Sequence, residues 1–228
     1  IKMKKNFLFT IAFAILFIGN FQKSSAQDMG ATALVDPTSP MCATDSQIVV
    51  VTIMNYDAFT IDFAVTPVTV SVLVTGASTQ TFTAAVNTGT LAAGATQDVT
   101  ITNAAIMAAS GVHNYDANTL VIGDLTPGND AMATVNITVN PLPTVDIGPD
   151  STQCGGTIVL DAGNSGSTFT WSNLDVTQTT TVSASSTYYV DVTDANSCAG
   201  SDTVIITINT VPTLTVTGNT TICGSGST

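Results

Sequence analysis

After Lys23 the sequence contains no lysine and no arginine, and glutamate is absent from the whole chain. The basic residues are Lys2, Lys4, Lys5 and Lys23, and all 16 acidic residues are aspartates. A chain so poor in cationic side chains cannot neutralise phosphates, so we do not expect it to bind nucleic acid. Its aspartates also repel one another, and divalent cations or high salt would relieve that repulsion.

Long apolar runs are missing as well, apart from residues 7–21. About 15 apolar residues fall short of the roughly 20 that a membrane-spanning helix needs. Lys4 and Lys5 follow the expected start at Met3, and the small residues Ser-Ser-Ala occupy positions 24–26. This order is typical of a cleaved secretory signal peptide over residues 1–26, with a membrane anchor as the alternative. We therefore expect an exported protein, secreted or at the cell surface, that begins at Gln27 with no transmembrane segment and a charge of 0 − 16 = −16.

Helical periodicity is scarce, while alternation of β-branched and polar residues recurs along the mature chain. The sequence predicts an all-β protein built of tandem immunoglobulin-like sandwiches, because many short strands separated by polar turns are typical of two packed sheets. Residues 27–41 show little pattern and are expected to be a lead-in. Residues 104–109 resemble one helical turn, but the stretch is too short and too closely flanked by strand pattern to predict a helix. The expected strands are residues 48–53, 60–65, 68–74, 79–85, 98–102, 112–122, 133–139, 144–147, 157–162, 168–172, 179–184, 187–193 and 202–208.

One segment occurs twice. It consists of a strand, a proline linker, a second strand and a Cys-Gly pair, which begins at Cys154 in the first occurrence and at Cys223 in the second. Matching positions differ by 212 − 143 = 223 − 154 = 69 residues. A fixed period of this size indicates an array of modules. We expect a first module over residues 27–140, a second over 141–210 and the start of a third over 211–228.

The second module resembles the immunoglobulin-like repeats of secreted Bacteroidetes surface proteins. The residues that carry the resemblance are Cys154-Gly155, Leu160, Ala162, Phe169-Thr170-Trp171-Ser172, Thr187-Tyr188-Tyr189-Val190-Asp191-Val192-Thr193-Asp194, Asn196 and Cys198. The first module is more loosely similar to bacterial cell-adhesion-related domains, through residues 91–96 and 128–130. The resemblance implies an extracellular role and export by the type IX pathway, although no C-terminal sorting domain is present in these 228 residues.

Four cysteines in an exported chain suggest disulfides. Cys154 and Cys198 share a module, so a bond between them is the simplest expectation. An immunoglobulin register argues against it, because the two residues would lie toward opposite ends of the sandwich, beyond disulfide reach. Free thiols or bonds to other modules therefore stay open, and the partners of Cys42 and Cys223 are not determined. No Cys-x-x-Cys pair indicates a metal site.

The rare aromatic residues and the single histidine raise two questions of function. Trp171, the only tryptophan, is expected in the core, with carbohydrate stacking by Trp171, Tyr188 or Tyr189 as the alternative. His113, the only histidine, lies in an alternating stretch without a nucleophile motif, so we expect a surface or strand residue rather than a catalytic base.

Clustered aspartates could bind calcium, although no strict calcium loop is present. Asp and Asn are also common turn formers, which is the simpler interpretation. Two short motifs, Asp150-Ser151-Thr152 and Asp202-Thr203-Val204, resemble Bacteroidetes O-glycosylation sites. The candidate calcium ligands are Asp191, Asp194 and Asn196 in one turn and Asp124, Asn129 and Asp130 in another.

The sequence names no catalytic residues and no required cofactor. We expect a non-enzymatic stalk or adhesion array that contacts other cell-surface or matrix components, including glycans. The alternatives are accessory spacer domains of a larger secreted exoenzyme, or a carbohydrate-binding module. Fold class alone does not decide among them, because one sandwich scaffold serves many tasks.

Overall fold

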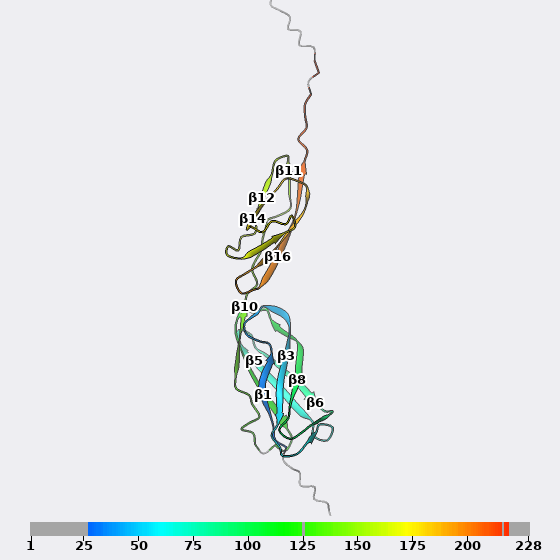
Figure 1. Ribbon diagram of the computed structural model, residues 1–228, viewed down its shortest axis with the longest axis vertical. Coiled ribbons are helices and arrows are strands. Elements are labelled where there is room, and N and C mark those ends of the chain that lie inside the picture. Colours follow the sequence, from blue (N-terminus) through cyan, green and yellow to red (C-terminus); the bar gives the residue numbers. More distant parts are fainter. Residues whose placement is uncertain (1–26, 125, 216, 219–228) are drawn as a thin grey trace, which may run out of the picture.

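The computed structural model describes residues 27–124, 126–215 and 217–218, and every regular element in that part is a β-strand. The predicted signal peptide and most of the predicted third module lie outside the described residues. Within the described part, no helix could cross a bilayer. The chain forms two immunoglobulin-like β-sandwiches, arranged end to end along the long axis in Figure 1.

The first sandwich contains a three-stranded sheet, β1-β3-β8, and a five-stranded sheet, β2-β10-β9-β5-β6. A short pair, β4-β7, adds to them. Its strands are β1 (Met29–Asp36), β2 (Met41–Cys42), β3 (Thr44–Asn55), β4 (Ile61–Asp62), β5 (Val68–Gly76), β6 (Gln80–Val86), β7 (Thr90–Leu91), β8 (Thr96–Met107), β9 (Gly111–Val121) and β10 (Val135–Asn140).

Alternation along the strands builds the first core. Val68, Val70, Val72 and Val74 of β5 are fully buried, whereas Leu73 between them is exposed, as period-two geometry requires. Val49, Val51 and Ile53 of β3 face them from the other sheet in one continuous cluster. The predicted strand over residues 68–74 is therefore confirmed, and its four valines lie on one buried face.

The second sandwich packs the sheet β11-β16-β15-β13 against the pair β12-β14. A separate core joins Trp171 and Val190 of the larger sheet to Leu160 and Val182 of the smaller one. Its strands are β11 (Ser151–Cys154), β12 (Ile158–Asp161), β13 (Thr168–Trp171), β14 (Thr179–Val182), β15 (Ser186–Thr193) and β16 (Ala199–Asn209).

Three expectations about local structure were wrong. Residues 29–36 are not a lead-in but form β1, which pairs antiparallel with β3. The small residues of this segment do not by themselves predict a strand. Only Ile61–Asp62 of residues 60–65 is a strand, and residues 104–107, for which no helix is predicted, continue β8. Residues 144–147 form no strand; Ile147 is buried there, and its N–H donates to the Asp202 Oδ2 carboxylate rather than to a backbone ladder.

Candidate functional site: the seam between the sandwiches

The end of β10 is where the first sandwich meets the second. The short strand β2 runs parallel to β10, with Cys42 beside Asn140, and the Ala43 N–H donates to the Asn140 carbonyl at 2.9 Å. The linker then leaves through Pro141, Leu142 and Pro143. We call this region, residues 39–45, 140–145 and 194–202, the seam.

A disulfide crosses the seam from Cys42 in the first sandwich to Cys198 in the second. The two Cα atoms are 5.5 Å apart although the residues are 156 positions apart in sequence. The expected bond between Cys154 and Cys198 is therefore wrong. Cys154 ends β11 and is an exposed free thiol, while Cys198 is fully buried in the turn before β16. The geometric objection to that bond was correct, because the two residues lie toward opposite ends of one sandwich.

A tight turn presents Cys198 to its partner. The Asp194 Oδ1 atom accepts hydrogen bonds from the N–H groups of Asn196 and Cys198, both at 2.9 Å. Ser197 adopts a positive φ of 65°, a conformation that closes the turn. Asp194 is thus used as a turn cap, while Asp191 lies exposed on β15. The simpler, turn-forming interpretation of residues 191–196 describes this arrangement.

The linker fits closely against the second sandwich. A Cβ atom on Gly200 would lie 2.4 Å from the Pro143 carbonyl oxygen, so a side chain at this position would push the linker away. On the other side, the Asn164 side-chain amide donates to the Thr144 carbonyl at 2.9 Å. The linker is therefore held by backbone and side-chain contacts as well as by the disulfide.

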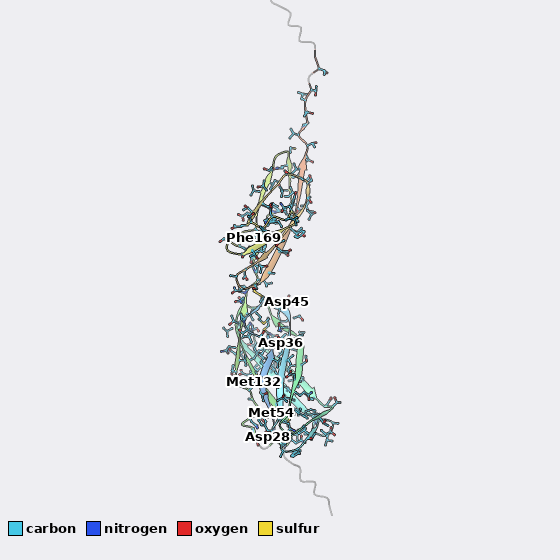
Figure 2. The ribbon with its side chains drawn as sticks, in the orientation of Figure 1. Asp28, Asp36, Asp45, Met54, Met132 and Phe169 are labelled. Carbon is cyan, nitrogen blue, oxygen red and sulfur yellow. A yellow bond between two sulfur atoms is a disulfide. The ribbon has the colours of Figure 1, made fainter. Side chains whose placement is uncertain are left out.

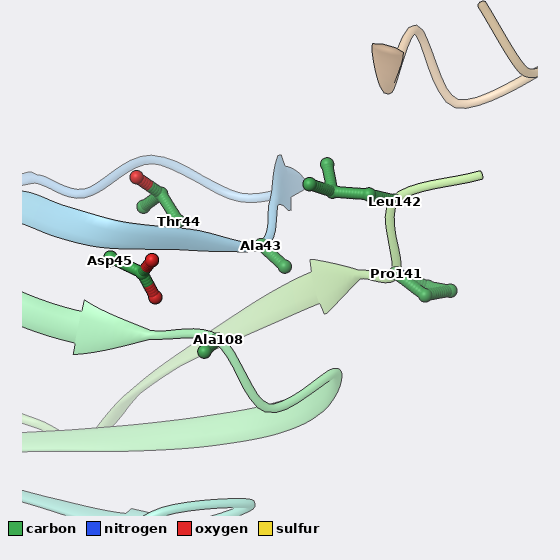
Figure 3. Close-up of a pocket in the computed structure, with 6 residues that line it drawn as sticks. All are labelled: Ala43, Thr44, Asp45, Ala108, Pro141 and Leu142. Carbon is green, nitrogen blue, oxygen red and sulfur yellow. The ribbon is translucent and has the colours of Figure 1, made fainter. Parts of the chain in front are cut away.

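A shallow pocket of about 270 Å³ opens at the seam. Figure 3 shows its lining, with Leu142 extending from the linker toward the chain at Ala43. Its lining is small and partly apolar, with Asp45 as the single charged residue, so the pocket shows no grouping of catalytic side chains. The lining residues are Ala43, Thr44, Asp45, Ala108, Pro141 and Leu142.

A carboxylate cluster occupies the opposite end of the first sandwich, near Asp28 in Figure 2. The cluster comprises Asp28, Asp124, Asn129 and Asp130. The Asn129 amide donates to Asp28 Oδ1 at 2.6 Å across 101 residues of sequence. The oxygens Asp124 Oδ2, Asn129 Oδ1 and Asp130 Oδ1 are buried and have no hydrogen-bond partner in the described chain.

Burial raises the pKa of Asp130 above its ordinary value of 3.8, and the neighbouring carboxylates Asp124 and Asp28 add to the effect. The described residues contain no group of three or more His, Cys or Asp side chains arranged to hold a metal ion. The structure thus brings the predicted ligands Asp124, Asn129 and Asp130 together and adds Asp28, which sequence reasoning missed. Calcium binding here stays a prediction.

The predicted core tryptophan is buried. Trp171 is 1% exposed, and its indole N–H donates to the Thr177 carbonyl at 2.8 Å. Tyr188 is also buried, and its hydroxyl donates to the Ala184 carbonyl four residues upstream, a corner bond found in immunoglobulin sandwiches. Only Tyr189 presents its ring to solvent, so the three aromatic residues do not form a carbohydrate-stacking platform.

His113 is fully buried on β9 rather than at the surface. Its Nε2 lies 2.9 Å from the Ala109 carbonyl and its Nδ1 lies 3.2 Å from Ser78 Oγ. The carbonyl can only accept, so Nε2 carries a proton and donates it to Ala109. Sequence reasoning missed this serine because no local motif links the two residues. The contact joins β9 to the turn between β5 and β6, and neither residue lines the pocket at the seam.

The two glycosylation motifs lie on the second sandwich, and their aspartates make structural bonds. Asp150 Oδ1 accepts from the Ile205 N–H at 2.8 Å, and Asp202 Oδ1 accepts from the Thr203 N–H at 2.8 Å. The hydroxyl-bearing residue Thr203 is exposed, while Ser151 is half-buried. Modification at either site stays a prediction.

Comparisons with known proteins find solved structures that resemble this chain only weakly, in sequence identity and in TM-score. No family model matches the chain, and no curated protein matches it. A CARDB domain from Pyrococcus furiosus, solved with di-metal ions, has a TM-score of 0.33 at 14% identity and covers 51% of this chain and 90% of its own.

Two further structures span both sandwiches. The DIP-gamma IG1+IG2 structure has a TM-score of 0.32 at 11% identity and covers 80% of this chain and 98% of its own. The Bacteroides ovatus glucan-utilisation protein SGBP-B, solved with a mixed-linkage heptasaccharide, has a TM-score of 0.24 at 13% identity, covering 79% and 47%. Likeness at this level carries no argument about function.

Proposed function

We propose that this chain is a non-enzymatic extracellular stalk, in which a disulfide joins successive sandwiches into a mechanically continuous rod. The observation that carries the proposal is the bond between Cys42 and Cys198, which joins two sandwiches that each have their own core. A protein that needed its sandwiches to move independently would not hold them by a covalent bond at the linker. Cell-surface or matrix components, including glycans, are the proposed partners.

The position of the disulfide determines how the rod carries tension. When the chain is pulled from residue 27 and from residue 215, the force passes from Cys42 directly to Cys198 through the sulfur atoms. Residues 43–197 are then outside the load path. Those 155 residues would otherwise release about 500 Å of extended chain at roughly 3.4 Å each. The disulfide therefore keeps the stalk from lengthening under load.

Single-molecule pulling between these two points tests the proposal. We expect the oxidised protein to show no unfolding step from residues 43–197, and the Cys42→Ser/Cys198→Ser variant to lengthen by about 500 Å more. Cys154→Ser is the matched control, because its thiol is free, and it should behave like the unaltered chain. Equal lengthening of the oxidised chain and the double variant would contradict a tension-bearing role.

The exoenzyme-spacer alternative uses the same rod, so a catalytic domain elsewhere in a longer protein would change the task of the stalk but not its mechanics. The carbohydrate-binding alternative lacks support from the aromatic residues, since Trp171 and Tyr188 are buried. Export, type IX sorting and glycosylation remain part of the proposal, supported by the sequence features described above.

A further inference from the structure

The free thiol of Cys154 lies at a position that matches Cys42 in the other sandwich. Cys42 ends the short strand β2, which pairs in parallel with the last strand of its sandwich beside Asn140. Cys154 ends β11, which pairs in parallel with the last strand of its own sandwich beside Asn209. Each cysteine therefore lies at the point where the chain leaves its sandwich.

The backbone around the two cysteines repeats the match. The residue after Cys42, Ala43, donates its N–H to the Asn140 carbonyl at 2.9 Å. The residue after Cys154, Gly155, donates its N–H to the Asn209 carbonyl at 2.8 Å. Sequence spacing does not reveal this correspondence, because 154 − 42 = 112 is not the repeat period.

The outgoing linkers also match. Leu142 lines the seam pocket beside Ala43, and Val211, which follows Leu142 by the 69-residue period, packs against Gly155. A Cβ on Gly155 would lie 2.6 Å from Val211 Cγ2, and Gly155 has a positive φ of 59°. The second linker therefore leaves the second sandwich beside Cys154 as the first linker leaves beside Cys42.

We propose that Cys154 is one half of a second seam disulfide, whose partner is the cysteine equivalent to Cys198 in a following module. The proposal rests on the stalk function, because it needs a further sandwich after residue 210. At the repeat period the partner is expected at position 198 + 69 = 267. Each module would then be bonded to the next by the same pair of positions.

The bond forms by ordinary thiol–disulfide chemistry. Two thiols each lose a proton, a sulfur–sulfur bond forms between them, and two electrons pass to a disulfide oxidant whose own sulfur–sulfur bond is reduced to two thiols. The exposure of Cys154 gives the oxidant access to its sulfur. An oxidising extracellular compartment favours the product.

A second bond changes the mechanics of every later module. Without it, a following module can lengthen by its full 69-residue period. With it, the shortest chain path from Cys198 to the next seam runs back to Cys154, which is 198 − 154 = 44 residues. The available extension per module should therefore fall by about one third.

A chimera built from this chain tests the inference. Residues 27–209 are followed directly by a second copy of residues 141–209, which contains a complete core of its own. The chimera has five cysteines: Cys42 and two copies each of Cys154 and Cys198. It is refolded in a mixture of oxidised and reduced glutathione, denatured without reduction and labelled at its free thiols.

We expect one free thiol, because the second copy of Cys154 alone lacks a partner, and a cross-linked peptide joining the first Cys154 to the second Cys198. A Ser201→Thr tag in the second copy distinguishes the two Cys198 peptides by mass. The matched variant Cys154→Ser in the first copy should leave two free thiols. Three free thiols in a folded chimera that retains the Cys42–Cys198 bond would overturn the inference while leaving the proposed stalk intact. Loss of the Cys42–Cys198 bond would instead count against both.

Discussion

At the scale of single residues, the chain must compensate 16 aspartates without any cation after Lys23. It does so with donors from the backbone, from side-chain amides and from threonine hydroxyls. Asp202 accepts from the Ile147 N–H, and Asp161 accepts from Gln178 and from the Gly163 N–H, which lowers the pKa of the Asp161 carboxyl. The cluster at Asp130 is the exception, because one buried oxygen of each of Asp124, Asn129 and Asp130 finds no donor in the described chain.

This difference predicts opposite effects of pH at two aspartates. Because the pKa of Asp130 is raised, the protonated carboxyl stabilises the fold below pH 3.8. This stability is lost as the pH rises through the pKa that Asp130 has in the folded protein. Asp130→Asn should therefore stabilise the protein at neutral pH and remove this loss. Asp161→Asn is the comparator, since its lowered pKa contributes stability above 3.8 that is lost as the pH falls. Urea unfolding between pH 3 and pH 7 measures both; the same sign of change at neutral pH for both variants would contradict the assignment.

Calcium provides a second prediction at this cluster. Carboxylate and amide oxygens are ligands that calcium prefers, and Asp124, Asn129 and Asp130 present unpartnered oxygens. We expect millimolar calcium to raise the melting temperature of the unaltered chain and to have less effect on Asp130→Asn. An unchanged melting temperature in calcium, compared with sodium chloride at equal ionic strength, would remove the hypothesis.

Trp171 fills the core of the smaller sandwich, so its loss should be costly. Trp171→Ala is expected to destabilise the second sandwich by about 3–5 kcal/mol, because it removes a large buried ring and leaves a cavity. Tyr189→Ala, which truncates an exposed ring, should change stability little. Chemical unfolding followed by tyrosine fluorescence and circular dichroism would check the pair. Equal effects of the two substitutions would place Trp171 outside the core.

At the scale of elements, a segment becomes a strand only where its backbone can form hydrogen bonds with a neighbouring strand. The small residues of β1 gain their place by pairing with β3, while residues 144–147, with stronger β-formers, run beside β16 without joining it. Gly200 at the start of β16 explains part of this arrangement, since the linker at Pro143 occupies the space of a side chain there. The linker, residues 141–145, therefore packs as a strap, an extended segment without strand pairing, across the end of the second sandwich.

Substitution of Gly200 tests the packing of this strap. Gly200→Ala places a methyl group against the Pro143 carbonyl and should destabilise the seam by about 1–3 kcal/mol, the usual cost of overpacking. Gly128→Ala is the matched control, because nothing lies near its Cβ position. Hydrogen exchange at the Ile147 amide, which bonds to Asp202, would report on the seam. Unchanged protection in Gly200→Ala would mean that the linker does not need the glycine.

At the scale of the whole molecule, the Cys42–Cys198 disulfide links two cores that are otherwise joined by one short linker. It closes a loop of 156 residues of sequence separation, so reduction should increase the entropy of the unfolded chain. The same bond gives the rod its resistance to lengthening. Stability and mechanics therefore depend on one pair of residues.

Removal of this pair should lower stability by about 2–5 kcal/mol in a chain-entropy account of disulfides. Cys42→Ser/Cys198→Ser is compared with Cys154→Ser in guanidinium unfolding under non-reducing conditions. We expect the double variant alone to unfold at lower denaturant concentration. Equal unfolding midpoints for the two variants would contradict this prediction. They would mean that the bond destabilises the native state as much as it destabilises the unfolded chain.

Several features were determined by the sequence itself: the strand class, the buried face of residues 68–74, the buried Trp171 and the lack of cationic partners. They depend on local alternation and composition, which each segment carries independently of the fold. Tertiary structure alone decided that Cys42 bonds to Cys198, that Ser78 meets His113, and that Asp28 joins Asn129. These contacts connect residues 156, 35 and 101 positions apart, and the order in which strands pair brings them together. Local pattern cannot specify that order, because period-two alternation fits many pairings equally well.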